Sequence, residues 1–304
     1  MTSFALIGLG KMGANMARRL ALGGVRAALF DQNPQTTTAL AGEIGGFAAS
    51  SLSALVNHLE APRVVWLMLP AGAVTEATIS QLQPLLSEGD VIVDGANSFY
   101  KDSVRRAATL TRNGLGFVDC GVSGGVHGLA NGYCLMAGGS DEAVGRVKPY
   151  LRLLAPAAAT GWLHAGPAGT GHFTKMVHNG IEYGMMQALA EGFALMDAKK
   201  EFAFDLAAIG ELWRHGSVVR SWLLDLTAEA LADPAGIAAI APHVSDSGEG
   251  RWTAMEAVEL GVPAPVMSLA LMMRFATQGN NDYPAKLLAK MRQGFGGHAV
   301  KPND

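Results

Sequence analysis

Four polar residues recur at helical spacing in the segment between positions 172 and 199. They are spaced i, i+3, i+4 and i+7 and are Lys175, His178, Asn179 and Glu182. On a helix such residues share one face and span about 10 Å along the axis. The amine and the carboxyl group could act as general base and general acid, because an apolar pocket and a neighbouring cation lower the pKa of a lysine. A solvated helix face with scattered polar groups is the alternative interpretation.

A glycine-rich loop near the N-terminus has the spacing of a dinucleotide-binding turn. It follows the apolar run Phe4–Ile7 and consists of Gly8-Leu9-Gly10-Lys11-Met12-Gly13. In this G-x-G-x-x-G pattern the first glycine allows a tight turn, the second lets the backbone approach a pyrophosphate, and the third lets a helix pack on the sheet. The helix N-terminus then offers amide N–H groups to the phosphates. A tight turn with no ligand is the alternative.

Asp31 occupies the position expected of the acidic residue in a dinucleotide site. It ends a second apolar run, Ala27–Phe30, and lies 23 positions after Gly8, near the spacing of roughly 20 that the motif expects. A carboxylate there accepts hydrogen bonds from the adenosine ribose hydroxyls and repels a 2′-phosphate. Gln32 follows, and no arginine is near to pair with such a phosphate. The pattern predicts NAD rather than NADP, although Asp31 or Asn33 could instead cap the next helix.

The composition limits the kind of protein that carries these residues. A chain of 304 residues holds about two domains, and 49% hydrophobic against 16% charged residues favours a large core or a sizeable subunit interface. A net charge of −3 argues against a nucleic-acid partner, and no apolar run is long enough to span a membrane. The first residues lack the features of a signal peptide. Cys120 and Cys134 have neither metal-ligand spacing nor disulfide density, so we expect reduced cysteines in a cytoplasmic protein and no metal site.

Short apolar runs alternate with helical patterns through the first half of the chain. Strands are predicted at Phe4–Ile7, Ala27–Phe30, Val64–Leu69, Val91–Val93 and Gly116–Asp119, with a weaker one at Tyr133–Ala137. Helices are predicted to begin near Ala14, Gln35, Val74, Lys101 and Asp141. This alternation predicts an α/β fold of the Rossmann type, with a doubly wound parallel sheet. Ligands bind such sheets beyond the carboxyl ends of the strands, where this chain has Gly8–Gly13, Asp31, Pro70-Ala71-Gly72, Asp94–Ser98 and Cys120–Gly125.

Strand signals fade after about residue 164. One long helix is predicted at His172–Lys199, and further helical segments at Ala207–Leu231, Thr253–Leu260, Val266–Ala276 and Ala285–Arg292. Glycines cluster between positions 161 and 171. We therefore predict an NAD-binding Rossmann-type domain over residues 1–163 and an all-α C-terminal domain for substrate binding and dimerisation over residues 164–304.

The motifs together resemble the 6-phosphogluconate dehydrogenases (decarboxylating), in particular a shorter, NAD-preferring bacterial branch of the β-hydroxyacid dehydrogenase superfamily. The resemblance covers essentially the whole chain. Its markers are the glycine loop, Asp94-Gly95-Ala96-Asn97-Ser98, Gly121-Val122-Ser123-Gly124-Gly125, Lys175-Met176-Val177-His178-Asn179-Gly180-Ile181-Glu182-Tyr183 and Arg292-Gln293-Gly294-Phe295-Gly296-Gly297-His298. The block from Lys175 to Tyr183 is the most specific.

The resemblance implies oxidative decarboxylation of 6-phospho-D-gluconate to D-ribulose 5-phosphate and CO2, with reduction of NAD. Lys175 would take the proton of the C3 hydroxyl, and Glu182 would protonate C1 of the enediol. The sugar acid would contact Asn97, Ser123, Gly124, Gly125, His178, Asn179 and Tyr183. Its phosphate would contact Tyr183, Arg251, Arg274, Arg292 and His298, since arginine pairs bidentately with phosphate oxygens. Besides the glycine loop, Asp31 and Gln32, the cofactor would contact Leu69, Pro70, Ala71 and Asn97, and we expect a homodimer or homotetramer.

Two departures from the family pattern leave roles open. Arg251 stands where the long members have lysine, and the two are not equivalent. The chain also lacks much of the long members' extra helical domain, so Arg292 and His298 could act in their own subunit or in a partner's. Two rival functions remain: a 3-hydroxyacid dehydrogenase resembling 3-hydroxyisobutyrate dehydrogenase, and a non-catalytic NAD-binding module. Glu182 and the segment from Arg292 to His298 favour the decarboxylating enzyme.

Overall fold

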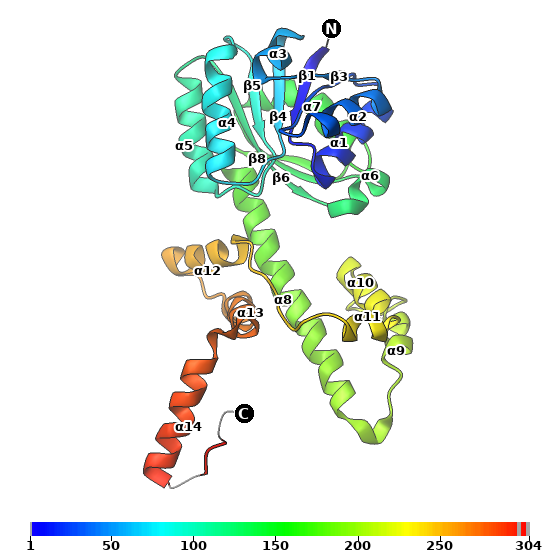
Figure 1. Cartoon of the computed structure of the whole chain (residues 1–304), viewed down its shortest axis with the longest axis vertical. Coiled ribbons are helices and arrows are strands. Elements are labelled where there is room, and N and C mark those ends of the chain that lie inside the picture. Colours follow the sequence, from blue (N-terminus) through cyan, green and yellow to red (C-terminus); the bar gives the residue numbers. More distant parts are fainter. Residues whose placement is uncertain (1, 297–298, 302–304) are drawn as a thin grey trace. The chain divides into compact units, whose positions relative to one another are not determined.

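The computed structural model describes residues 2–296 and 299–301, and the chain divides into two compact units, residues 1–176 and 177–304 (Figure 1). The division falls inside the long helix α8 (Thr170–Ala198), which begins in the first unit and ends in the second. The domain boundary at residues 163 and 164 stays a prediction. A Rossmann-type α/β unit followed by a helical part is confirmed.

The first unit is built on one eight-stranded sheet in the order β3-β2-β1-β4-β5-β6-β7-β8. Every neighbouring pair is parallel except β6 and β7. The strands are β1 (Thr2–Ile7), β2 (Ala28–Phe30), β3 (Phe47–Ala48), β4 (Leu59–Leu67), β5 (Val91–Asp94), β6 (Gly116–Ser123), β7 (Cys134–Gly139) and β8 (Trp162–Gly166). The two short outer strands β3 and β8 were not predicted, because neither has a strong apolar run.

Helices cover both faces of this sheet. Strand β1 is apolar from Phe4 to Ile7 because both of its faces are buried under helices. Phe4 and Leu6 pack into one core cluster with α1 and α7, while Ala5 and Ile7 pack into a second cluster with α3, α4 and α5. All four side chains are buried, as expected of a strand that has no solvent-facing side. The helices are α1 (Lys11–Leu22), α2 (Pro34–Ile44), α3 (Leu52–Asn57), α4 (Ala73–Leu82), α5 (Tyr100–Thr111), α6 (Gly128–Asn131) and α7 (Asp141–Leu154), with short turns η1 (Gln83–Leu85) and η2 (Gly125–His127).

The predicted doubly wound sheet is confirmed, and it is parallel as predicted except at one pair of strands. β7 runs antiparallel to β6, with Asp119 opposite Gly138 and Ser123 opposite Cys134. The connection between them, residues 124–133, contains only η2 and α6. It is too short for the crossover that a parallel neighbour needs. The strand predicted to end at Asp119 therefore continues to Ser123, and it pairs with the returning chain from Val118 to Ser123.

The second unit is entirely helical in its described part. After α8 it contains η3 (Lys200–Phe202), α9 (Leu206–Trp213), α10 (Trp222–Leu231), α11 (Pro234–Ala238), α12 (Glu249–Leu260), α13 (Pro265–Phe275), η4 (Ala276–Asn280) and α14 (Asp282–Gly296). The segment predicted as helical from Ala207 to Leu231 is two helices. Gly216 interrupts it at a φ of +76°, and the Ser221 side chain caps α10 by accepting from the Leu224 amide.

Candidate active site

The loop between β1 and α1 has the geometry that a pyrophosphate site requires. Gly8 has a φ of +90°, and a side chain there would collide with the carbonyl oxygen of Met68. A side chain at Gly13 would collide with the carbonyl oxygen of Gly8, whereas Gly10 faces open space. Gly10 also precedes α1 without a side-chain cap, so the first amides of the helix face the opening beside it. The residues present therefore fit a dinucleotide phosphate.

A cleft of about 970 Å³ lies beside this loop in the first unit. It brings together six of the predicted cofactor residues: Gly8, Gly10, Asp31, Gln32, Leu69 and Pro70. The cleft is also lined by Ser50, Ser51, Thr78 and Gln81, which were not predicted. These residues follow β3 or lie on α4, and neither place carries a motif that could have identified them.

Asp31 connects the end of β2 to the glycine loop. Its Oδ2 accepts a hydrogen bond from the Leu9 amide at 2.7 Å, and its Oδ1 accepts one from the Asn33 amide at 2.9 Å. The cap of α2 is Asn33, whose side chain accepts from the Gln35 and Thr36 amides. Each carboxylate oxygen of Asp31 retains acceptor capacity for a ribose hydroxyl.

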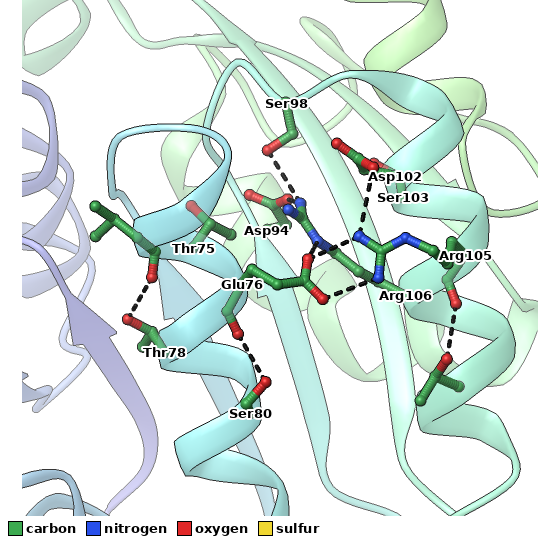
Figure 2. Close-up of polar contacts among 12 residues, drawn as sticks. Thr75, Glu76, Thr78, Ser80, Asp94, Ser98, Asp102, Ser103, Arg105 and Arg106 are labelled. Carbon is green, nitrogen blue, oxygen red and sulfur yellow. Dashed lines mark hydrogen bonds and ion pairs between the residues drawn. The ribbon is translucent and has the colours of Figure 1, made fainter.

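A buried ion network holds the loop that carries Asn97 (Figure 2). Arg106 on α5 donates to Asp94 at 2.8 Å, to Ser98 at 3.3 Å and to Glu76 on α4 at 2.8 Å. Asp94 also accepts from the Ala96 amide at 3.1 Å. Asn97 is exposed between buried neighbours, so the loop presents this amide side chain outward from a fixed base.

Glu76 is the partly exposed end of this network. Its carboxylate accepts from Arg105 at 2.8 and 2.9 Å as well as from Arg106. The hydrogen bonds from Arg105, and then those from Arg106, lower the pKa of Glu76 to about 2 against the opposing effect of burial. Because Glu76 lies on α4, which lines the cofactor cleft, the network joins that wall of the cleft to the Asn97 loop.

Lys175 lies in the second turn of α8, against strand β6. Its side chain is buried, and a side chain added at Gly121 would collide with the Lys175 Cβ. Gly121 is therefore required for the lysine to approach the strand. Ser123 is the last residue of β6 and is half-buried, and the loop of Gly124 and Gly125 follows it.

The next turns of α8 lie in the second unit and carry the other residues of the polar stripe. His178 Nδ1 is 3.2 Å from Asn179 Oδ1 and 3.8 Å from Glu182 Oε2. The His178 and Glu182 side chains are more than one-third exposed, whereas Asn179 is buried. Helical spacing places this stripe and Lys175 on one side of α8.

Tyr183 and Arg274 form a stacked pair within the second unit. The guanidinium carbon of Arg274 lies 3.3 Å from the centroid of the Tyr183 ring, which is a cation–π contact. The ring is buried, and its hydroxyl has no hydrogen-bond partner in the described part of the chain. A side chain at Gly250 on α12 would collide with the ring, so this glycine allows α12 to pack there.

Arg251 is held by an acidic partner of its own. It donates to Asp246 Oδ2 at 2.8 and 3.1 Å and lies 5.0 Å from the centroid of the Phe275 ring. Arg274 donates to the neighbouring carbonyl oxygen of Ser245 at 3.0 Å. The segment of Ser245 and Asp246 thus contacts both arginines, although no motif in the sequence marks it.

Comparisons with known proteins agree over nearly the whole chain. Residues 3–163 match the NAD binding domain of 6-phosphogluconate dehydrogenase, and residues 171–282 match the 6-phosphogluconate dehydrogenase C-terminal domain. A protein of Bacillus subtilis (strain 168), provisionally named a 6-phosphogluconate dehydrogenase, is 40% identical over 97% of this chain and 98% of its own. A Haloferax volcanii protein named 6-phosphogluconate dehydrogenase, NAD(+)-dependent, decarboxylating, is 38% identical over 98% of both chains.

This chain belongs to the 6-phosphogluconate dehydrogenase family. A solved structure of the Plasmodium falciparum 6-phosphogluconate dehydrogenase superposes with a TM-score of 0.85 at 29% identity. The superposition covers 99% of this chain and 67% of the Plasmodium chain.

Within this member of the 6-phosphogluconate dehydrogenase family, the remaining predicted residues lie in several different segments. Leu9, Lys11 and Met12 lie within the glycine loop, where Lys11 and Met12 begin α1, and Ala71 precedes α4. Arg292 is exposed on α14, and His298 lies outside the described residues. No three or more His, Cys, Asp or Glu side chains are grouped to hold a metal ion in residues 2–296 and 299–301. Among the helices that the structure describes, none is both long and apolar enough to cross a membrane.

Proposed function

We propose that this chain catalyses the NAD-dependent oxidative decarboxylation of 6-phospho-D-gluconate to D-ribulose 5-phosphate and CO2. The observation that carries the proposal is helix α8, which bears Lys175 buried against Gly121 and then His178, Asn179 and Glu182 on the same side. A base and an acid seven residues apart on one helix suit a substrate that loses a hydroxyl proton at one carbon and gains a proton at the neighbouring carbon.

The two ionisable groups of the stripe divide the proton transfers between them. Lys175 accepts the proton of the C3 hydroxyl as that carbon is oxidised, and NAD, when bound, supplies the acceptor for the C3 hydride. Lys175 then holds this proton beside the new C3 carbonyl oxygen, where it stabilises the enolate formed as the C1 carboxyl group leaves as CO2. Glu182 donates a proton to the carbon that carried the carboxyl group, which completes ribulose 5-phosphate.

The remaining polar residues bind and orient the substrate. Asn97 contacts the sugar acid from the loop after β5, Ser123 from the end of β6, and Gly124 and Gly125 from the loop that follows it. His178 and Asn179 contact it from α8. The phosphate is bound by Arg274 and by the hydroxyl of Tyr183, whose lack of a partner in the described residues supports this role. Arg251, Arg292 and His298 are further proposed phosphate ligands.

NAD is the proposed cofactor in preference to NADP. The carboxylate of Asp31 is held by the Leu9 amide beside the cleft, and the following Gln32 is uncharged. This carboxylate would repel a 2′-phosphate and accept from a 2′-hydroxyl. The Haloferax volcanii relative, named NAD(+)-dependent, supports the same choice.

We also propose a homodimer or homotetramer and a cytoplasmic location. Support for self-association comes from exposed apolar side chains along α12 and α13, which include Met255, Val258, Val266, Leu269 and Met272. Apolar groups gathered on one part of a surface are typical of interfaces. Sedimentation of the purified chain tests this proposal.

The activity is tested by offering the purified protein 6-phosphogluconate, gluconate and 3-hydroxyisobutyrate with NAD or NADP, while NADH or NADPH and CO2 are both measured. The proposal expects equal amounts of NADH and CO2 from 6-phosphogluconate and much less from gluconate, which lacks the phosphate. NADH without CO2, or a preference for 3-hydroxyisobutyrate, would contradict it. No turnover of any of the three would favour a non-catalytic NAD-binding module.

A further inference from the structure

Asp119 is a buried carboxylate that the proposed reaction does not use. It lies on β6, has no exposed surface and accepts hydrogen bonds from two backbone amides at the start of α8. Its Oδ1 accepts from the Gly169 amide at 2.6 Å, and its Oδ2 accepts from the His172 amide at 2.8 Å. Neither amide has a partner within the helix itself. One side chain from a neighbouring strand therefore performs the function that a capping box divides between two residues of the helix.

Alternate residues of β6 share one face and follow one another toward the site. They are Asp119, Gly121 and Ser123. Asp119 anchors the start of α8, Gly121 leaves room for the Lys175 side chain, and Ser123 ends the strand. Asp119 therefore fixes where α8 begins relative to β6. This in turn fixes the position at which the Lys175 side chain meets the strand.

The contact between α8 and the sheet leaves no room for the helix start to shift. A side chain at Gly171 would collide with the carbonyl oxygens of Asp119 and Met136, and one at Gly138 would lie 2.6 Å from Asp119 Oδ1. The His172 Nδ1 atom lies 2.7 Å from the Ser103 hydroxyl on α5, which fixes the rotation of the first turn. Burial raises the pKa of the Asp119 carboxyl, while His172 and the two amides favour its ionised form.

We infer that Asp119 is a positioning residue, which sets the place of the Lys175 amine through the two amide hydrogen bonds at the start of α8. The inference rests on the proposed function, in which Lys175 is the base. Lys175 follows His172 by one helical turn, so a displaced first turn displaces the amine. Misplacement of a catalytic group by about 1 Å can cost roughly a hundredfold in rate.

Asp119→Asn is the test, and Asp90→Asn is its matched control. Asp90 has no exposed surface and accepts from two backbone amides, those of Arg63 at 2.7 Å and Ser87 at 2.9 Å. It precedes β5, at the end of the sheet opposite the proposed site. In both variants the new amide group can accept only one of the two bonds and opposes the other N–H. Asp90→Asn also weakens the ion pair between Asp90 and the Arg63 guanidinium at 2.8 Å, so it disturbs folding at least as much as Asp119→Asn but lies at the opposite end of the sheet from Lys175.

With 6-phosphogluconate and NAD, Asp119→Asn should lower kcat by roughly ten- to a hundredfold and leave the KM for NAD unchanged. Asp90→Asn should lower the melting temperature but keep the wild-type kcat. A wild-type kcat in Asp119→Asn, or equal losses in both variants, would overturn the inference. If Asp119→Asn does not fold, Asp119→Ser is the second variant, because its small hydroxyl can turn its O–H away from the two amides; the same outcomes apply to it.

A second readout does not depend on the reaction. Acetylation of Lys175 by acetic anhydride, followed by mass spectrometry with the exposed Lys148 as internal reference, reports where the amine lies and how reactive it is. Asp119→Asn should change the Lys175 rate several-fold, and Asp90→Asn should not. If the wild type does not decarboxylate 6-phosphogluconate but this difference is found, the proposed function fails and the positioning role stands. Equal Lys175 rates in all three proteins would refute the positioning role.

Discussion

Glu76→Gln should destabilise the first unit at neutral pH, and the loss should disappear in acid. The Glu76 carboxylate bridges α4 to two arginines of α5, and Arg106 continues the network to Asp94 and Ser98 (Figure 2). Glutamine keeps the shape and one acceptor oxygen but removes the charge. The substitution therefore tests the electrostatic part of this contact rather than its packing.

The size of the effect follows from the pKa of Glu76. Its displacement from 4.5 to about 2 would be worth about 3.4 kcal/mol at about 1.4 kcal/mol per pH unit. The Glu76 side chain is 39% exposed, so solvent screening reduces the expected loss to roughly 1 kcal/mol. Because the folded pKa is lowered, this stabilisation is fully present above pH 4.5 and is lost as the pH falls toward 2.

Urea unfolding of the wild type and of Glu76→Gln, repeated at several values between about pH 7 and pH 3, measures this difference. The difference in free energy of unfolding between the wild type and Glu76→Gln should be constant near neutral pH and should decrease steadily below about pH 4.5. Glu43→Gln is the control, since Glu43 pairs with Arg18 at 2.6 Å on an exposed surface and its loss should have no measurable effect. If the free energy of unfolding of Glu76→Gln differs from that of the wild type by an amount that does not change with pH, the electrostatic explanation is wrong.

Three further predictions concern the proposed site. Lys175→Met should abolish turnover while NAD still binds, as measured by calorimetry, and near-normal activity would remove Lys175 as the base. Asp31→Asn should keep an acceptor for the Leu9 amide but reduce the preference for NAD over NADP by roughly tenfold or more, because a charged hydrogen-bond acceptor is lost; an unchanged ratio of kcat/KM values would mean that selectivity lies elsewhere. Tyr183→Phe should raise the KM for 6-phosphogluconate by roughly two- to tenfold with little change in kcat. An unaltered KM would exclude the phenol from phosphate binding.

The features predicted best from the sequence are those whose physics is local. The glycine loop could be recognised because a strand, a tight turn and a helix start follow one another within a few residues. The long helix was predicted as His172–Lys199 and is observed as Thr170–Ala198, because its apolar pattern persists over many turns. The alternative that Asn33 caps α2 was also accessible from sequence, although only the structure shows that Asp31 binds the Leu9 amide instead.

Contacts between distant residues could not be predicted in this way. Asp119 is 50 residues from Gly169, and Arg106 is 30 residues from Glu76. Whether two such side chains come into contact depends on the order and register of the strands. The periodicity of apolar residues in the sequence does not predict either. The same limit explains the antiparallel β7, which follows from a short connection rather than from the residues of the strand itself.

By itself, the sequence determined that a dinucleotide loop precedes a helix bearing a lysine, a histidine, an asparagine and a glutamate on one side. These statements depend only on spacing along the chain, which covalent geometry converts directly into helical and strand positions. The tertiary structure decided which buried groups hold those residues in place. Arg106 anchors the Asn97 loop, Gly121 admits the Lys175 side chain and Asp119 caps the helix that carries it, because each contact requires two segments to be brought together by the packing of the sheet and its helices.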